Sequence, residues 1–378
     1  MMIKVSDIQF YPIKLNSVRR EGLSADLVSS RSSFDLVIVK VITDSSLVGF
    51  GEVISRSGSS SSGLMNVLKA SAKALIGSDI LNPNAMGRTF DDAIDDIRTT
   101  WSAVGAAFEM ASFDLMGKAR GVPAYSVLGG QYRTNLERSA LLADVAPEEA
   151  ALQAKKRIKE GFCGLKMSSR DGNRSAEQDL NTVLAVLDAV ESDIHLNVLV
   201  GNKWENAEQV TSFFSSLLSD SFFGNVSVEQ PLSPLDLDGL AKLREILPVS
   251  VVLSESVSSP DAMVQIAHHA AADRITLNIS RVGGLSQAQK IVHICDAAAI
   301  GVSVCAPVGS RLGLSAHTHL ASTIRDPLPI DIGNSLAPER EPFSGGFDMM
   351  GGRLVLGDQP GLGVDLNEDV LRAMVVNT

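Results

Sequence analysis

Short apolar segments recur at a nearly constant interval through residues 137–334. Six of them begin at residues 163, 195, 225, 249, 274 and 301, so the intervals are 32, 30, 24, 25 and 27 residues. Amphipathic stretches with helical periodicity separate them, and the interval is the size of one βα unit. Further segments at 137–143 and 329–334 bring the number of strands to eight. We therefore predict an α/β fold with a parallel, modified (β/α)8-type barrel over residues 131–334.

The segments that flank this barrel have a different pattern. Residues 1–60 contain three strand-like stretches, and helices follow to about residue 130. Gly49 and Gly51, in the third stretch, are interpreted as turn residues. We predict an α+β capping domain over residues 1–130, completed by a C-terminal tail over residues 335–378. The polar, Ser-rich stretch 20–33 is expected to close over the barrel mouth.

Composition excludes several classes of function. The chain has 33 Lys and Arg against 44 Asp and Glu, a net charge of -11, which argues against nucleic acid and anionic membranes as partners. No segment approaches the roughly 18 continuous apolar residues of a membrane span, and the first residues lack the apolar run of a signal peptide. The three cysteines form no CxxC pair. We therefore expect reduced thiols and a cytoplasmic location.

In a barrel of this kind the ligand lies at the carboxyl ends of the strands. The residues at these ends are therefore the candidate site residues. The side chains at or beside these ends, from the second strand to the sixth, are Lys166, Ser168, Leu199, Glu229, Ser254, Asn278 and Ser280. Four basic residues follow barrel strands, namely Arg170, Lys203, Arg281 and Arg311. If they converge they would suit an anionic ligand; the alternative is ordinary solvated loop charge or salt bridges.

The chain resembles the mandelate racemase and muconate lactonizing branch of the enolase superfamily over nearly its whole length. The stretches that carry the resemblance, in matching order and spacing, are GFGEV at 49–53, AAFEMASFDLMGKARGVPAYSVLGG at 106–130, VSVEQPL at 226–232, LSESV at 253–257, ITLNISRVGGLSQAQ at 275–289 and GDQPGLGVDLNED at 357–369. The resemblance implies an isomerase or lyase that removes a proton next to a carboxylate. It also implies a Mg²⁺ ion that stabilises the enolate, lysine bases beside it, and a homo-oligomer.

The metal ligands that the resemblance implies are largely missing from this sequence. The family holds Mg²⁺ with acids at the ends of the third, fourth and fifth strands. These positions fall on Leu199, Glu229 and Ser254, so only Glu229 is retained. Because Mg²⁺ needs several hard oxygen ligands, we expect no bound metal and no other cofactor.

The implied lysine bases are also largely replaced. Lys166 matches the first lysine of the family's K-x-K pair, but Ser168 stands in place of the second and Asn278 in place of the lysine on the sixth strand. Lys166 either acts as a base with a pKa lowered by burial, or pairs with Glu229 in place of the metal. We expect the pair, because an unpaired buried carboxylate is costly.

Three interpretations of function follow, and they leave open whether the protein is an enzyme. The leading one is a diverged family member that binds a small anionic ligand without Mg²⁺-assisted enolate chemistry. The alternative is a racemase, cycloisomerase or dehydratase that abstracts a proton next to a carboxylate, either without metal through Lys166 or with replacement ligands from loops. A purely structural partner of an active homologue is a further possibility. The expected ligand-contacting residues are Ser168, Arg170, Asn278, Ser280 and Arg311.

Overall fold

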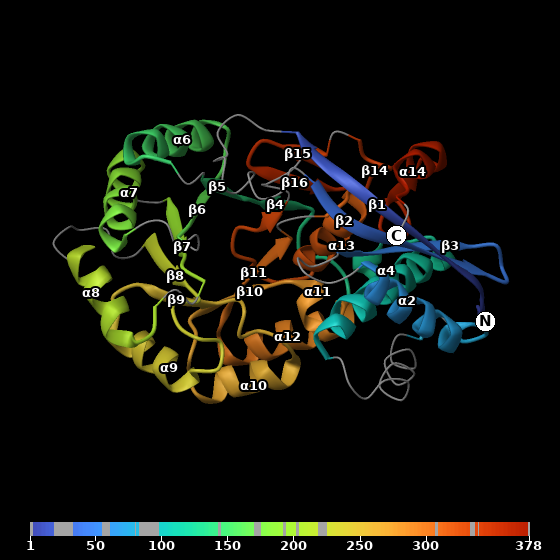
Figure 1. Ribbon diagram of the computed structural model, residues 1–378, viewed down its shortest axis with the longest axis horizontal. Helices are drawn as coiled ribbons and strands as arrows, with labels where there is room; N and C mark the ends of the chain where they lie inside the picture. The colour runs from blue at the N-terminus through green and yellow to red at the C-terminus, as the bar shows by residue number, and fades with distance from the viewer. Residues whose placement is uncertain are drawn as a thin grey trace.

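The computed structural model places a barrel of parallel strands beside a layer of antiparallel strands and helices (Figure 1). None of the helices that the structure describes is long and apolar enough to span a bilayer. The residues described are 3–18, 33–54, 61–79, 81–82, 98–142, 145–169, 175–191, 194–201, 204–217, 225–306, 309–332, 337–338 and 340–376. The predicted closing loop, 20–33, lies outside them except for Ser33.

The barrel is an eight-stranded parallel sheet with the order β12-β11-β10-β9-β8-β7-β6-β5, which confirms the predicted fold. A parallel bridge between Arg138 and Ile330 brings its first and last strands together. Next to it, the Ser139 N–H donates to the Ile330 carbonyl at 2.9 Å. The strands are β5 (Ser139–Leu142), β6 (Gly164–Ser168), β7 (His195–Leu199), β8 (Val226–Glu229), β9 (Ser250–Leu253), β10 (Arg274–Leu277), β11 (Gly301–Ala306) and β12 (Asp331–Ile332).

Helices connect successive strands, and polar caps set where several of them begin. One boundary differs from the sequence prediction, which continued the sixth strand to Ser280. The strand ends at Leu277 because the Asn278 side chain accepts a hydrogen bond from the Arg281 N–H at 3.2 Å and starts a short helix. The helices are α6 (Pro147–Lys159), α7 (Ala176–Ala189), α8 (Ala207–Leu217), α9 (Leu237–Ile246), α10 (Pro260–His268), α11 (Ile279–Val282), α12 (Leu285–Ala298) and α13 (Arg311–Ser322).

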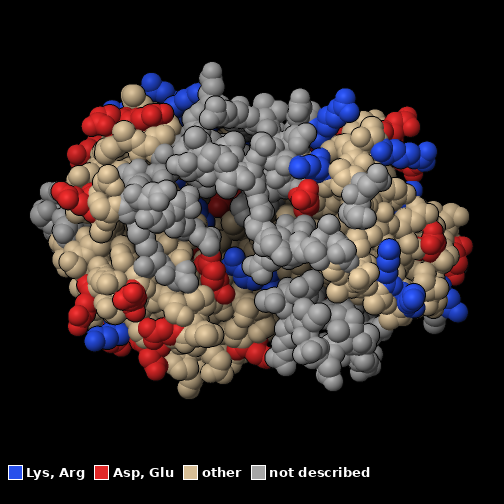
Figure 2. Space-filling model, viewed as in Figure 1, with Lys and Arg blue, Asp and Glu red and all other residues tan. Residues whose placement is uncertain are grey.

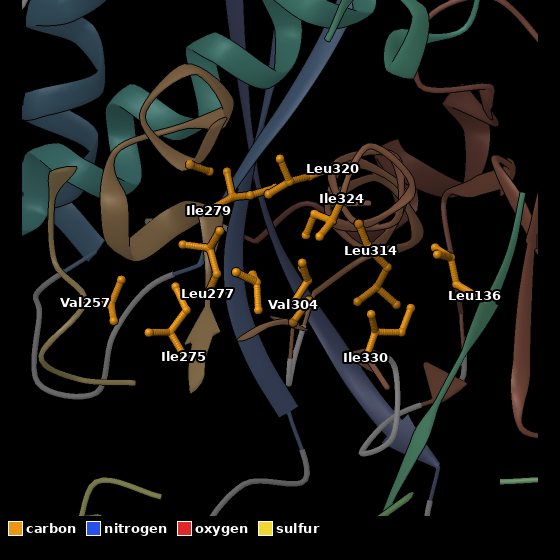
Figure 3. Packing of buried hydrophobic residues seen from close by; sticks show 14 of the residues in the cluster. Leu136, Val257, Ile275, Leu277, Ile279, Val304, Leu314, Leu320, Ile324 and Ile330 are labelled. Atoms are coloured by element: carbon orange, nitrogen blue, oxygen red, sulfur yellow. The ribbon is translucent and has the colours of Figure 1, made fainter. Parts of the chain in front are cut away.

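Branched apolar side chains fill the space between the barrel strands and the outer helices. Figure 3 shows Leu277 and Val304 packed beside each other, with Leu314 of α13 close to Ile330. All four lie in one continuous hydrophobic core. Because strand side chains alternate between faces, the residues between these apolar positions face the barrel interior. That interior is where the polar side chains of the site are found.

The capping layer is an antiparallel meander, and α4 packs on it. Gly49 and Gly51 are not turn residues, as the sequence had suggested, but lie within β3. A Cβ atom on Gly49 would come 2.5 Å from the Ala111 carbonyl oxygen, and one on Gly51 would overlap the Ala107 carbonyl. Glycine is needed there because the α4 backbone approaches the strand closely. The elements are β1 (Val5–Val18), β2 (Ser33–Thr43), β3 (Val48–Ile54), α2 (Ser61–Leu75), α4 (Arg98–Arg120) and α5 (Ala124–Val127).

The C-terminal segment contacts both the cap and the start of the barrel. β13 pairs with β1, and Val375 forms an antiparallel bridge with Ile13. β16 pairs with both β15 and β4, whereas β14 pairs with β17. The boundaries predicted between the three segments stay a prediction. These elements are β4 (Asn135–Glu137), β13 (Ala337–Pro338), β14 (Phe343–Gly345), β15 (Phe347–Met350), β16 (Arg353–Leu356), β17 (Val364–Leu366) and α14 (Glu368–Met374).

Candidate functional site

Lys166 lies at the centre of a group of charged side chains inside the barrel. Its neighbours Leu165 and Met167 point to the opposite face of β6, so the lysine points inward and is only 5% exposed. The Lys166 Nζ lies 2.9 Å from Oε2 of Glu229 on β8 and 3.2 Å from Oδ2 of Asp331 on β12. The contact between Lys166 and Glu229 that we expected from the sequence is confirmed. One ammonium group is thus held between two carboxylates.

The charge state of Lys166 follows from its surroundings. Burial by itself lowers the pKa of Lys166, but the carboxylates of Glu229 and Asp331, with a contribution from Cys305, raise it above its ordinary range. Lys166 is therefore an ammonium ion at neutral pH. In this state it can donate hydrogen bonds and stabilise negative charge. The possibility that burial turns Lys166 into a neutral base is not supported.

A chain of hydrogen bonds continues from Glu229 towards the amino-terminal end of the barrel. The Asn197 Nδ2 donates to Oε2 of Glu229, and the Ser227 hydroxyl donates to Oδ1 of Asn197 at 2.9 Å. The Nε2 of His195 lies 3.0 Å from the same hydroxyl. These side chains occupy inward positions on β7 and β8. The Lys166 Nζ also donates to Oε1 of Glu229 at 3.2 Å, so both oxygens of Glu229 receive hydrogen bonds from the protein itself.

Asp331 and Asn197 are members of this site that the sequence analysis missed. Asp331 forms an ion pair with the Lys166 ammonium. The Cys305 thiol donates a hydrogen bond to Oδ2 of Asp331 at 3.4 Å. Burial and the Asp331 charge raise the pKa of Cys305 well above its ordinary value, so this cysteine is a protonated thiol and not a ready nucleophile. Asp331 is next to the last residue of the eighth strand, so applying the strand-end rule to that strand would have found it. Asn197 lies two residues before the end of its strand, deeper in the barrel.

The three positions at which the sequence predicts a degraded metal site lie at the ends of neighbouring strands: Leu199 and Glu229 are the last residues of β7 and β8, and Ser254 follows β9. Leu199 offers no ligand atom. The Ser254 hydroxyl donates to the Glu255 carboxylate, and the Glu229 oxygens bind Lys166 and Asn197. As a donor set, these side chains do not fit Mg²⁺, which prefers several oxygen ligands in octahedral geometry. Among the residues that the structure describes, no group of three His, Cys, Asp or Glu side chains could hold a metal ion.

The polar residues expected to contact a ligand are only partly brought together. Ser168 ends β6 and Ser280 lies in α11, and both are half-buried. The amide of Asn278 is held at both ends. Its oxygen caps α11, and its nitrogen donates to the Cys305 carbonyl at 3.1 Å. Asn278 therefore ties β10 to β11, and contact between these residues and a ligand stays a prediction.

The basic residues that follow the strands do not form one cluster in the described part of the chain. Arg281 donates to the Ser254 carbonyl at 2.7 Å. Arg311 donates to the carbonyls of Gly345 and Phe347, with its guanidinium 4.5 Å from the centroid of the Phe347 ring. Both guanidinium groups thus hold the protein's own backbone. The other two residues lie outside the described residues, namely Arg170 and Lys203.

The face of the molecule shown in Figure 2 is hollowed near its centre, and both acidic and basic side chains are visible inside the hollow. Elsewhere on this face, charged side chains of both signs are interspersed. A ligand that enters the hollow therefore meets charged groups in a recess, where electrostatic interactions are stronger than on an open surface.

Comparison with known proteins relates most of the chain to one group. Residues 149–370 match the family model described as enolase C-terminal domain-like. Residues 23–129 match the mandelate racemase / muconate lactonizing enzyme, N-terminal domain. The chain is 28% identical to an N-succinyl-L-Arg/Lys racemase from Bacillus cereus, over 99% of this chain and 98% of the racemase. It is 30% identical to an L-Ala-D/L-Glu epimerase from Bacillus subtilis, over 87% of this chain and 88% of the epimerase.

Solved structures give the same result. The crystal structure of the Bacillus cereus racemase superposes with a TM-score of 0.87 at 27% identity, covering 100% of this chain and 99% of that one. A dipeptide epimerase from Enterococcus faecalis, complexed with Mg and the dipeptide L-Leu-L-Tyr, has a TM-score of 0.83 at 26% identity. It covers 97% of this chain and 100% of its own. The interpretation of a ligand binder without catalytic activity is therefore wrong, because nearly full-length relatives are named as racemases and epimerases.

Proposed function

Because the chain belongs to the mandelate racemase and muconate lactonizing branch of the enolase superfamily, we propose that it is an enzyme that removes a proton from a carbon atom next to a carboxylate. Racemisation, epimerisation and cycloisomerisation all include such a proton transfer. The relatives named for N-succinyl amino acids and dipeptides support small carboxylate-containing substrates. The observation that carries the proposal is the buried Lys166 ammonium between two carboxylates.

The proposed role of Lys166 is electrostatic. When the proton leaves, the electron pair of the C–H bond moves towards the substrate carboxylate, whose oxygens gain negative charge. A cation that is already in place, in a site of low dielectric, stabilises this charge more than it stabilises the substrate. Lys166 supplies such a cation, since Glu229 and Asp331 hold it from two sides and keep it protonated.

Asp331 is our candidate for the group that accepts the proton. A carboxylate can serve as a general base where it has access to the substrate. The Asp331 side chain is 11% exposed, whereas the Glu229 side chain is 2% exposed and receives hydrogen bonds on both oxygens. Asp331 is thus the more accessible of the two carboxylates beside Lys166.

We also propose that the reaction does not depend on Mg²⁺. Leu199, Glu229 and Ser254 form a donor set that does not fit this ion. In this proposal the Lys166 ammonium supplies the positive charge that a metal ion supplies in related enzymes. Association of several copies of the chain, implied by the family, also stays a prediction that light scattering can check.

Isotope exchange tests the reaction class directly. The purified protein is incubated in D₂O with a panel of N-succinyl amino acids and dipeptides, and the α-proton signal is followed by NMR. We expect the signal of at least one compound to disappear. Lys166→Ala should slow this exchange by about 100-fold or more, because one positioned charged or acid–base group contributes that much. Lys155→Ala, on the exposed face of α6, is the matched control and should exchange at the parent rate.

Two results would contradict the proposal: one concerns the reaction class, and the other concerns the independence from Mg²⁺. If no compound in the panel loses its α-proton signal, the reaction class is wrong. If exchange occurs but EDTA abolishes it and millimolar MgCl₂ restores it, the reaction class stands and the metal independence is wrong.

A further inference from the structure

A cavity with both polar and apolar walls lies at the end of the barrel opposite to the strand ends that carry Glu229. It has a volume of about 270 Å³. Its walls include the first residues of three strands, namely Ser139 of β5, His195 of β7 and Arg274 of β10. Lys166 and Asp331, which form an ion pair with each other, also line it. The cavity therefore extends from the amino-terminal ends of the strands to the charged group described above.

The side chains around this cavity are unusual for a barrel interior. Branched apolar residues normally dominate there and fill the space. Here Ser227, Thr276 and Ser303 line it together with the apolar Val252, Ile275 and Leu328. The serine and threonine side chains are shorter than leucine or isoleucine, so they leave space, and they bring hydrogen-bonding groups into it. A space with such walls suits a polar occupant, because buried polar groups need partners.

Arg274 gives the cavity a positive charge. Its Nη1 lies 3.0 Å from Nε2 of His195, and within the described ranges the guanidinium makes no ion pair with a carboxylate. The neighbouring acid, Asp273, is bound by Arg244 at 2.6 Å. Burial and the Arg274 charge lower the pKa of His195 to about 4, so the imidazole is neutral at neutral pH. Arg274 thus faces the cavity as a half-buried cation beside a neutral ring.

We propose that this cavity binds a small oxyanion, of the class of inorganic phosphate or a short-chain carboxylate, through the guanidinium group of Arg274. Guanidinium groups bind such anions by two parallel hydrogen bonds. The amide of Asn225 and the hydroxyl of Thr276 line the same space and can donate further hydrogen bonds. The cavity volume of about 270 Å³ accommodates a small ion of this class.

Calorimetric titration tests the site without any substrate of the enzyme. Inorganic phosphate and acetate are titrated separately into the full-length protein, with ionic strength held constant by NaCl. We expect saturable binding of at least one anion, and a loss of affinity of at least tenfold in Arg274→Gln. Arg244→Gln is the matched control, because Arg244 is the neighbouring arginine that already has a carboxylate partner. It should bind the anion as the parent does.

A second measurement needs no variant, in case Arg274→Gln fails to fold. Crystals of the parent protein are soaked in selenate, and an anomalous peak is expected beside the Arg274 guanidinium. The proposal is overturned if neither phosphate nor acetate binds, or if Arg274→Gln binds as tightly as the parent. It is also overturned if no peak appears in the cavity of crystals soaked in selenate, where phosphate binds, or in bromoacetate, where acetate alone binds. Binding of phosphate alone identifies a tetrahedral oxyanion, and binding of acetate alone identifies a carboxylate. These results do not depend on whether the isotope-exchange experiment succeeds.

Discussion

At the scale of single residues, Lys166 determines the stability of the site as well as its chemistry. Lys166→Ala leaves the carboxylates of Glu229 and Asp331 close together inside the barrel without their shared cation. Removing one partner of a buried ion pair typically costs about 3–5 kcal/mol, because the remaining charge is uncompensated. We expect urea denaturation at pH 7 to show a loss of about 3 kcal/mol in the free energy of unfolding.

The double variant Lys166→Met with Glu229→Gln is the control for this experiment. It removes one positive and one negative charge and keeps side chains of similar volume. Its loss of stability should be smaller than the sum for the two single variants, because interacting residues are not additive. Lys166→Ala with the stability of the parent would show that the ion pair contributes nothing.

The residues of the site were predictable only in part from the sequence. The alternation of side chains along a strand indicates which residues face inward, and it correctly brought together Lys166 and Glu229. It could not show that Asn197 of β7 meets Glu229 of the neighbouring strand β8, because that contact depends on the register of the two strands and on the conformations of their side chains. The absence of the usual acids also misled the interpretation of activity. The sequence showed which metal ligands and bases are replaced. It did not show that the Lys166 ammonium lies between the carboxylates of Glu229 and Asp331.

At the scale of elements, the contact between β3 and α4 depends on a strand glycine. A Cβ atom on Gly51 would overlap the Ala107 carbonyl of α4, so Gly51→Ala must push the helix away from the strand. Overpacking of this kind typically costs about 1–3 kcal/mol. We expect a loss of about 2 kcal/mol in the free energy of unfolding, measured by urea denaturation.

The control for this prediction is Gly105→Ala, within α4 itself. Its nearest neighbour would be the Gly283 carbonyl oxygen at 3.4 Å, so the methyl group needs only a slight adjustment. Alanine also favours a helix over glycine by about 0.5–1 kcal/mol. Gly105→Ala should therefore be as stable as the parent or more stable, and equal losses in both variants would contradict the proposed cause.

The same elements show where reading the sequence fails. Periodicity located the barrel strands and their spacing, since a buried face imposes a repeat of about two or 3.6 residues. It misinterpreted Gly49 and Gly51 as turn residues, because a close approach of another backbone is a tertiary contact. It also extended the sixth strand to Ser280, because apolar and polar residues continue to alternate through the point where Asn278 starts a helix.

At the scale of the whole molecule, buried carboxyl groups join the cap to the barrel. Glu52 of β3 accepts a hydrogen bond from the Ser310 N–H at 3.1 Å, at the start of α13. Glu109 of α4 accepts one from the Ser286 N–H at 2.8 Å, near the start of α12. Burial raises the pKa of each carboxyl to about 7, although these hydrogen bonds oppose the shift. The contacts between cap and barrel therefore include groups that titrate near neutral pH.

Glu52→Gln should change how stability depends on pH. The folded state holds the Glu52 proton up to a pKa of about 7, whereas the unfolded state releases it near 4.5. Glu52 therefore favours folding below pH 4.5, and this contribution is lost as the pH rises to about 7. Glutamine does not titrate. The stability of the variant relative to the parent should therefore rise by up to about 3 kcal/mol between pH 4.5 and 7.5, at about 1.4 kcal/mol per pKa unit.

Urea denaturation at several pH values measures this difference. Glu341 accepts a hydrogen bond from the Arg311 N–H at 2.9 Å. Its negative charge contributes to the raised pKa of Glu52, so the titration involves both groups. Glu208→Gln, on the exposed face of α8, is the control and should run parallel to the parent at every pH. A constant difference between Glu52→Gln and the parent would mean that Glu52 does not titrate in this range.

The pairing of the C-terminal segment with β1 has a consequence for synthesis. The N–H of Val376 donates to the Pro12 carbonyl, and Val375 bridges Ile13, on the edge of β1 that β2 leaves open. A ribosome that adds about 5–20 residues per second needs on the order of tens of seconds to travel from β1 to these residues. During that time the edge is available to strands of neighbouring nascent chains. Residues that are translated long after β1 thus protect the edge of this strand from aggregation.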